Sequence, residues 1–208
     1  MEFSQIPVIN MESNVFHPCQ GLGDAVTIKE KLGKTQGKKY VLTWAYHPKA
    51  LPMATPNSQI LAACDLGMNI TVAHPPGWEL DPQIIEAMSQ RVKQTGGSIH
   101  FSNSMEEALK GAKVVCAKSW GALNYYGNWA REKEIRDQLK GWIVTQEKMS
   151  LTDNAIFMHC LPVRRNVKVT DEVLDGKNSV ILDEAENRMW AQMALLSELI
   201  GGHYDNKS

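Results

Sequence analysis

The chain has 208 residues, and its 22 basic and 23 acidic side chains give a formal net charge of -1. Mixed charges of this kind give no general attraction to nucleic acid or to an anionic membrane, so we predict neither as a partner. The four cysteines are widely spaced and form no C-x-x-C pair, which argues against a metal site and favours reduced thiols. With neither a signal peptide nor a long apolar span in the sequence, we expect a cytoplasmic protein.

Short apolar runs rich in β-branched residues alternate with segments of helical periodicity. The predicted strands are residues 40–45, 69–73, 98–101, 113–117, 155–158 and 179–182. Helix starts are predicted at Thr55 and Asp81, each of which precedes a proline, and at Ser104, where Glu107 completes a capping-box pattern. The alternation predicts an α/β fold: a doubly wound, mainly parallel, Rossmann-like sheet with helices on both faces and ligand sites at the carboxyl ends of its strands.

Two terminal segments fit this domain less well. Residues 6–11 predict a short strand, but no earlier strand precedes it in the sequence to lie beside it. The last predicted helix, about residues 184–200, carries apolar side chains at helical spacing that need a surface to cover. Both segments are consistent with contact to a neighbouring domain. The polar tail after Gly201 is predicted to be disordered.

His-Pro-Cys-Gln at residues 17–20 opens a predicted helix. A neutral imidazole can donate one hydrogen bond, and an amide can both donate and accept. His17 and Gln20 are therefore equipped to polarise a carbonyl and to hold an adjacent NH2 group. The alternative is an ordinary helix start with a half-exposed histidine.

His-Cys-Leu-Pro at residues 159–162 ends a predicted strand. Pro162 cannot continue the pairing, so we expect the carbonyl groups of Cys160 and Leu161 to point out of the sheet unpaired. Three basic side chains follow: Arg164, Arg165 and Lys168. This layout predicts a cationic loop that holds a small anionic ligand, with ordinary core packing of Cys160 and Leu161 as the alternative.

The combination of H-P-x-Q, H-C-L-P and a late Glu186-Asn187-Arg188 resembles the aspartate/ornithine transcarbamylases. The resemblance covers essentially the whole chain, but the family's phosphate loop, of the S-x-R-T-R kind, is absent from these residues. It implies four parts: residues 1–35 as the last strand and linker helix of a carbamoyl-phosphate domain, 36–183 as the amino-acid-binding domain, 184–201 as a returning C-terminal helix, and 202–208 as a tail.

The resemblance also implies a set of site residues. Those expected to bind carbamoyl phosphate are His17, Pro18, Cys19, Gln20, Cys160, Leu161 and Arg188. Within this set, the catalytic residues are His17, Gln20, Cys160 and Leu161. Arg188 would contact the carbonyl or phosphate oxygens, with a surface arginine as the alternative. Catalysis would depend on orientation and electrostatic stabilisation, without a metal or cofactor.

Residues 115–123 indicate which amino acid is used. Ornithine enzymes of the family carry an aspartate and an S-M-G turn here, because free ornithine presents an α-ammonium group. This chain has Lys118 instead, within a K-S-W-G-A-L that is similar to that of the N-acylornithine transcarbamylases. An acylated substrate keeps its carboxylate but lacks the α-ammonium, so a lysine suits it.

Four residues are therefore expected to bind an acylornithine: Glu12, His47, Lys118 and Leu161. Of these, His47 follows the first long strand and fits a substrate loop. Lys168 matches a lysine that is carboxylated in the acetylornithine enzymes. For Lys118 and Lys168, a solvated strand or loop end is the alternative.

The resemblance implies carbamoyl transfer from carbamoyl phosphate to the side-chain amine of N-acetyl-L-ornithine, giving N-acetylcitrulline in arginine biosynthesis. The full-length family is expected to form homotrimers. The spacing from Glu12 to His17 and the loop at residues 51–58 look closer to the succinylornithine branch, so N-succinylornithine is an alternative substrate. A second alternative is a non-catalytic amino-acid-binding module. A Rossmann dehydrogenase is disfavoured because no strand is followed by G-x-G-x-x-G.

Overall fold

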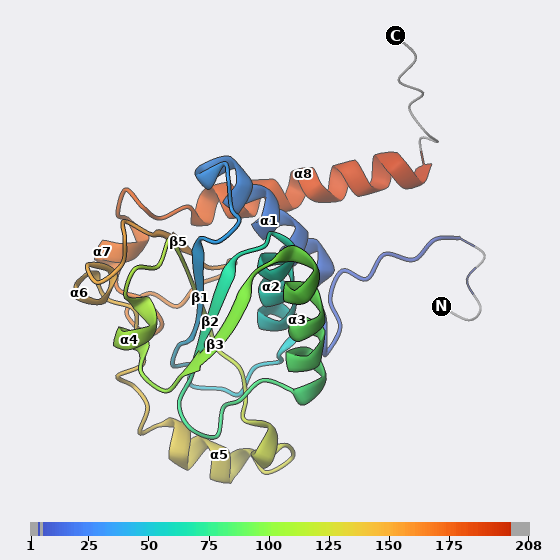
Figure 1. Cartoon of the computed structure of the whole chain (residues 1–208). Helices are drawn as coiled ribbons and strands as arrows, with labels where there is room; N and C mark the ends of the chain where they lie inside the picture. The colour runs from blue at the N-terminus through green and yellow to red at the C-terminus, as the bar shows by residue number, and fades with distance from the viewer. Residues whose placement is uncertain (1–3, 5, 201–208) are drawn as a thin grey trace.

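The computed structural model describes residue 4 and residues 6–200, and its centre is a parallel sheet between two layers of helices (Figure 1). The strands are β1 (Lys39–Trp44), β2 (Asn69–Ala73), β3 (Ser98–Ser102), β4 (Val114–Lys118) and β5 (Ile156–Met158). Their order is β3-β2-β1-β4-β5, and every neighbouring pair is parallel. The predicted doubly wound α/β fold is confirmed.

Eight α-helices and one short 3-10 turn connect and cover the strands in the described part of the chain. They are α1 (Pro18–Leu32), α2 (Ala54–Asp65), α3 (Pro82–Thr95), α4 (Met105–Leu109), η1 (Leu123–Tyr125), α5 (Trp129–Arg136), α6 (Gln146–Met149), α7 (Asp171–Leu174) and α8 (Ile181–Ile200). None of the helices in the described ranges combines the length and apolar character needed to cross a membrane.

The predicted helix starts are largely confirmed. The Asp81 carboxylate accepts a hydrogen bond from the backbone N of Gln83 at 2.8 Å, and the Ser104 hydroxyl accepts one from the backbone N of Glu107 at 3.2 Å. The Glu107 carboxylate pairs with a lysine one turn later, so the capping box is only half formed. Thr55 is the second residue of α2, whose N-cap is Met53, so this helix begins two residues earlier than predicted.

Two apolar layers hold the sheet. Because side chains alternate along a strand, Tyr40, Leu42 and Trp44 of β1 pack into one layer, whereas Val41 packs into the other. The first layer is closed by α1, α2 and α3, and the second by α4, α6 and α7 (Figure 1). Strands buried on both faces read as continuous apolar runs, which is why the sequence pattern located them.

The strand order places a switch point between β1 and β4. The chain moves from β1 to β2 on one side of the sheet and returns to β4 on the other. The carboxyl ends of β1 and β4 therefore mark the edge of the sheet at which α/β proteins bind ligands. Hydrogen bonds join the segments that follow these two strands, such as the one from the backbone N of Gly121 to the Leu51 carbonyl at 2.9 Å.

Two predicted strands are wrong. Residues 179–182 contribute only an isolated parallel bridge between Ser179 and Phe157, and α8 begins at Ile181. Leu182 is 72% exposed, so this short apolar run is the start of a helix, and periodicity cannot separate these two states over four residues. Residues 6–11 are irregular, and within the described ranges their apolar side chains Ile6, Val8 and Met11 are exposed and unpaired with any strand. The predicted disordered tail lies outside the described residues.

The predicted last helix is confirmed as α8, which lies along α1 and projects beyond the sheet (Figure 1). Its buried side chains, Glu184, Asn187 and Ala191, are spaced three and four residues apart. The two helices approach closely at Gly23, where a Cβ atom would lie only 2.9 Å from the Cα atom of Arg188. A glycine at this position is therefore needed for the contact between α1 and α8.

Candidate functional site

The centre of the candidate site is a lysine–cysteine contact at the carboxyl edge of the sheet. Lys118 is the last residue of β4, and Cys160 follows β5. The Lys118 Nζ atom donates to the Cys160 Sγ atom at 2.8 Å. Two residues predicted from separate motifs thus meet beside the switch point. Trp120 of the same K-S-W motif is buried in the core, where its indole Nε1 donates to the Trp78 carbonyl at 2.9 Å.

A buried histidine–lysine pair lies behind this contact. The imidazole Nδ1 of His159 hydrogen-bonds the Cys160 carbonyl, which fixes Nδ1 as the donor and leaves Nε2 to accept from Lys168 Nζ at 3.3 Å. The Cys160 carbonyl is therefore not free, contrary to the sequence expectation. Burial lowers the pKa of His159 well below its usual value and lowers the pKa of Lys168 to about 7, with the nearby Lys118 charge adding to both effects.

A second group of polar side chains joins α1 and α8 to the end of β5. The amide nitrogen of Gln20 donates to Asp24 Oδ1 at 2.7 Å and to Glu184 Oε1 at 3.0 Å, and the amide oxygen accepts from Arg188 Nη1 at 3.2 Å. The other oxygen of Glu184 accepts from the backbone N of His159 at 2.8 Å. Gln20 is buried with both ends of its amide occupied, and it holds Arg188 in place.

Asp24 and Glu184 form a buried acid pair, with exposed fractions of 2% and 0%. Burial raises the pKa of Asp24 to about 6 and raises that of Glu184 well above its usual value, and the negative charge of Asp24 adds to the shift of Glu184. Ionising both of two adjacent carboxyl groups in an apolar setting costs a large free energy, so the pair retains a proton near neutral pH.

His17 precedes α1 and faces the same region. Its backbone N donates to the Ser58 hydroxyl at 2.7 Å, which ties the start of α1 to α2. Burial lowers the pKa of the His17 imidazole, Glu12 opposes this effect, and Arg188 and Lys118 reinforce it. The Nδ1 atom is buried and has no hydrogen-bond partner within residue 4 and residues 6–200. Nδ1 is thus an unpaired buried polar atom in the described residues, and a hydrogen bond between the ring and the Met11 backbone raises the pKa of the imidazole.

The neighbouring residues of the H-P-C-Q motif have structural contacts. Pro18 is the first residue of α1, as its fixed φ favours. Cys19 is buried, and its thiol contacts the Met11 sulfur at 3.9 Å. Glu12 is exposed in the irregular segment before the helix.

The site is bordered by the loop after β1 and by a second loop after β5, and these two loops differ in their charge. His47 after β1 is buried, its Nδ1 contacts the Lys49 backbone, and its pKa is lowered by burial and by the charges of Lys168 and Arg164. In the second loop, Arg165 pairs with Asp171 of α7 and with Asp175, which follows α7, so its charge is neutralised. The cationic character of that loop therefore comes from Arg164 and Lys168.

Leu161 follows Cys160 and is the exposed end of the H-C-L-P turn. Its side chain is 40% exposed, and its peptide bond to Pro162 is cis. In the described part of the chain, its carbonyl accepts no hydrogen bond, as the sequence predicted. This oxygen is free to accept from an amine or amide.

Several supporting residues were not predicted from the sequence. These residues include Asp24 and Glu184. They also include Glu132 and Arg136 of α5, a buried ion pair that connects the loop after β1 to the loop after β4. The Glu132 carboxylate accepts from the backbone N of Ala122 at 3.2 Å, and Arg136 donates to the Pro48 carbonyl at 3.2 Å. The i, i+4 spacing of Glu132 with Arg136 and of Gln20 with Asp24 was the available signal, but it does not reveal the distant partners.

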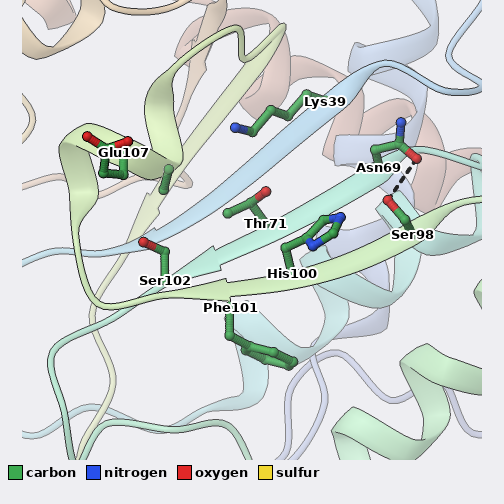
Figure 2. Close-up of a pocket in the computed structure, with 9 residues that line it drawn as sticks. Lys39, Asn69, Thr71, Ser98, His100, Phe101, Ser102 and Glu107 are labelled. Atoms are coloured by element: carbon green, nitrogen blue, oxygen red, sulfur yellow. Dashed lines mark hydrogen bonds between the residues drawn. The ribbon is translucent and has the colours of Figure 1, made fainter.

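A hollow of about 410 Å³ lies elsewhere, on the open sheet face formed by β1, β2 and β3 (Figure 2). Lys39 and His100 border it, but Lys39 donates to the Lys110 carbonyl at 2.8 Å, and Asn69 and Ser98 bond to each other. This hollow contains none of the predicted site residues. Within the described ranges, no group of three His, Cys, Asp or Glu side chains is arranged to hold a metal ion.

Fold and site together define a doubly wound α/β domain that presents cationic and amide groups at its switch point, as expected for a domain that binds a small anionic substrate. Residues 53–199 match the sequence model described as "Aspartate/ornithine carbamoyltransferase, Asp/Orn binding domain". The match covers more than half of the chain, so the chain belongs to this family.

Comparison with individual relatives places the chain near the N-acetylornithine enzymes. It is 48% identical over 203 residues to N-acetylornithine carbamoyltransferase of Xanthomonas campestris pv. campestris, with 96% of this chain and 60% of that protein covered. It is 38% identical over 206 residues to N-succinylornithine carbamoyltransferase of Bacteroides thetaiotaomicron, with 97% of this chain and 58% of that protein covered.

Among solved structures, acetylornithine transcarbamylase complexed with acetylcitrulline matches with a TM-score of 0.93 and 48% identity, covering 95% of this chain and 60% of that one. The chain thus spans about 60% of the length of the relatives that it matches.

Proposed function

We propose that this chain is the amino-acid-binding portion of an N-acetylornithine carbamoyltransferase. The reaction transfers the carbamoyl group of carbamoyl phosphate to the side-chain amine of N-acetyl-L-ornithine, giving N-acetylcitrulline and phosphate for arginine biosynthesis. The observation that carries the proposal is the position of Lys118: an ammonium group, in place of a carboxylate, ends β4 at the switch point beside Cys160.

The electrostatics of this position favour an acylated amino acid. Free ornithine brings an α-ammonium that the Lys118 charge repels, whereas an N-acylornithine brings only its α-carboxylate near the backbone nitrogen. Glu12 and His47 are proposed to complete the acylornithine contacts, because Glu12 acts on the pKa of His17 and His47 lies near the charges of Lys168 and Arg164. The 48% identity to N-acetylornithine carbamoyltransferase supports this choice over N-succinylornithine, whose relative is 38% identical.

The carbamoyl group is proposed to lie between α1 and the H-C-L-P turn. His17, with its free Nδ1, polarises the carbonyl, and Arg188 stabilises the oxygen on which negative charge develops. The carbonyl of Leu161 accepts from the attacking amine, and Cys160 lines the same position. The amide oxygen of Gln20 orients Arg188, and its second lone pair accepts from the carbamoyl NH2 when substrate binds. Pro18 and Cys19 fix the start of the helix that presents these groups.

Lys168 is proposed to carry a carboxylate. Its side chain is 3% exposed and its pKa is about 7, so the neutral amine is well populated at neutral pH and can add to carbon dioxide, releasing a proton and giving a carbamate. The nearby charges of Lys118 and Arg164 would stabilise the new anion. NMR of the chain in 13C-bicarbonate should show a carbamate carbon resonance that strengthens from pH 6 to pH 8 and is absent from Lys168→Met. The same resonance in that variant would contradict the assignment.

The domain limits and assembly are part of the same proposal. Residues 1–35 and 184–201 would adjoin a carbamoyl-phosphate domain, residues 36–183 would form the amino-acid-binding domain, and residues 202–208 would be a tail. A complete protein of this kind would be a cytoplasmic homotrimer. The packing of α8 on α1 supports the pairing of the first two segments.

A non-catalytic amino-acid-binding module is the second candidate, because the Lys118 position beside Cys160 is sufficient for binding an acylated amino acid. Isothermal titration with N-acetylornithine, N-succinylornithine and ornithine, each with and without carbamoyl phosphate, distinguishes the two candidate functions. Preference for N-acetylornithine with coupling to carbamoyl phosphate supports the carbamoyltransferase site, and binding without coupling supports the module. Preference for ornithine, or no binding of any amino acid, would reject the proposal.

Variants of Lys118 sharpen this test. Lys118→Met should weaken N-acetylornithine binding by about 10- to 100-fold, because a charge-assisted contact contributes about 1.5–3 kcal/mol. Lys118→Arg keeps the charge and should retain more of the affinity. We expect the 208-residue chain to show little turnover by itself, because the S-x-R-T-R phosphate loop is absent from its sequence.

A further inference from the structure

Lys118 and Cys160 are an amine and a thiol in direct contact. Their Nζ and Sγ atoms are 2.8 Å apart, a separation that one oxygen atom can bridge. In residue 4 and residues 6–200, Cys160 provides the one hydrogen bond of the Lys118 ammonium group, so no carboxylate holds the amine away from the sulfur. Both side chains are half-buried, and small solutes can therefore reach them.

The other cysteines are protected from oxidation. Cys19, Cys64 and Cys116 are all buried. Burial raises the pKa of Cys64 to about 12 and that of Cys116 well above its usual value, so neither forms the reactive thiolate at neutral pH. Cys160 differs because it is partly exposed and lies beside two lysines, the setting typical of oxidation-sensitive cysteines.

We propose that hydrogen peroxide links Lys118 to Cys160 through a reversible N–O–S bridge, and that this bridge closes the amino-acid site by preventing an acylornithine from binding there. The second part rests on the proposed function, whereas the bridge itself does not. The proposal adds a redox modification to a pair of residues that otherwise serves substrate binding.

The chemistry consumes two molecules of hydrogen peroxide. The first oxidises the Cys160 thiol to a sulfenic acid and is reduced to water. The second exchanges its hydroperoxyl group for the sulfenic hydroxyl, which leaves as water and gives a sulfur hydroperoxide. The deprotonated Lys118 amine then attacks the sulfur-bound oxygen. The N–O bond forms as the O–O bond breaks, and the distal hydroxide leaves as water with a proton from nitrogen.

The bridge would change the site in two ways. The nitrogen of an N–O–S group is far less basic than an amine, so the position loses its positive charge. The linked side chains are also fixed across the carboxyl ends of β4 and β5, where the substrate is proposed to lie. Acylornithine affinity should fall at least tenfold.

The test treats the 208-residue chain with hydrogen peroxide and maps its peptides by mass spectrometry. The expected product is a cross-linked pair of peptides, containing Lys118 and Cys160, that has gained one oxygen and lost two hydrogens, and that dithiothreitol separates. Cys19, Cys64 and Cys116 serve as internal references and should remain reduced. Lys118→Arg keeps the charge but has no primary amine, so its Cys160 should give only sulfenic and sulfinic acids.

Only sulfinic acid at Cys160 of the parent chain, or a cross-link of Cys160 to another residue, would overturn the bridge. Circular dichroism melting of Lys118→Arg establishes that the variant is folded. An excess of N-acetylornithine during oxidation should protect the pair at least tenfold in rate. If the bridge forms but N-acetylornithine neither binds nor protects, the proposed function fails and the bridge stands. If the bridged chain still binds N-acetylornithine normally, closure of the site is refuted.

Discussion

The buried acids Asp24 and Glu184 are the residues on which the arrangement of the site depends most. They bind the two amide hydrogens of Gln20 and the backbone N of His159, and thereby connect α1, α8 and the end of β5. A carboxyl group this deeply buried is tolerated because the pair retains a proton and its polar neighbours satisfy most of its hydrogen bonds. One oxygen of Asp24 still has no partner in the described part of the chain.

Asp24 should make stability depend on pH. Its folded pKa of about 6 is above its ordinary value of 3.8, so between these values the folded state holds a proton that the unfolded state has lost. The free energy of unfolding should therefore fall as pH rises from about 4 to about 6. Each tenfold change in proton affinity is worth about 1.4 kcal/mol, so this group contributes a fall on the order of 3 kcal/mol.

Asp24→Asn removes that group while keeping its shape. Urea unfolding at a series of pH values should show that the variant gains stability relative to the parent chain as pH rises through this window. The Asp24 charge also raises the pKa values of Glu184, Tyr40 and Cys116, so the difference between the two proteins reports the titration of the coupled Asp24–Glu184 pair. Parallel stability profiles for the two proteins would contradict the assigned protonation.

The sequence predicted the site residues at the ends of strands, but it did not predict the buried residues that hold those site residues in place. Lys118 and Cys160 follow buried strands, and parallel strands bring their carboxyl ends to one edge, so their proximity follows from the pattern. The partnership of Gln20 with Glu184 joins segments that are far apart in the chain. It depends on how α8 crosses α1, which no local pattern encodes.

At the scale of elements, the site depends on the contact between α1 and α8. Gly23 permits it, because an added Cβ atom would lie 2.9 Å from the Cα atom of Arg188.

The predicted strand at residues 40–45 was confirmed and the predicted strand at residues 179–182 was wrong, and the burial of their side chains explains the difference. The first run is buried throughout, whereas Leu182 of the second is exposed and its neighbours continue with helical periodicity.

Gly23→Ala should destabilise the chain even though alanine favours helices. Overpacking costs about 1–3 kcal/mol, and helix propensity returns about 1 kcal/mol, so we expect a net loss of up to about 2 kcal/mol in unfolding free energy. Arg188 should also be displaced from Gln20. Gly141→Ala is the matched control, because its Cβ atom would meet nothing within 4 Å. Equal stabilities of the two variants would show that α1 and α8 can separate without cost.

At the scale of the whole molecule, α8 presents two unlike faces. The buried face carries Glu184, Asn187 and Ala191. The exposed face carries larger apolar side chains at helical spacing: Met189, Trp190, Met193, Leu196 and Ile200. An apolar stripe of this kind is unusual on a monomer and marks a contact surface. In the proposed full-length protein this surface would adjoin the carbamoyl-phosphate domain.

The 208-residue chain should therefore self-associate through α8. Sedimentation velocity should give an average sedimentation coefficient that rises with concentration for the parent chain. Substituting Met193→Gln and Leu196→Gln together removes apolar burial worth about 3 kcal/mol, which should weaken association roughly a hundredfold. Phe101→Ser on β3 also removes an exposed apolar side chain, which is 47% exposed, but it lies away from α8 and should leave association unchanged. If the Phe101 variant alone dissociates, the contact lies at β3 and not on α8.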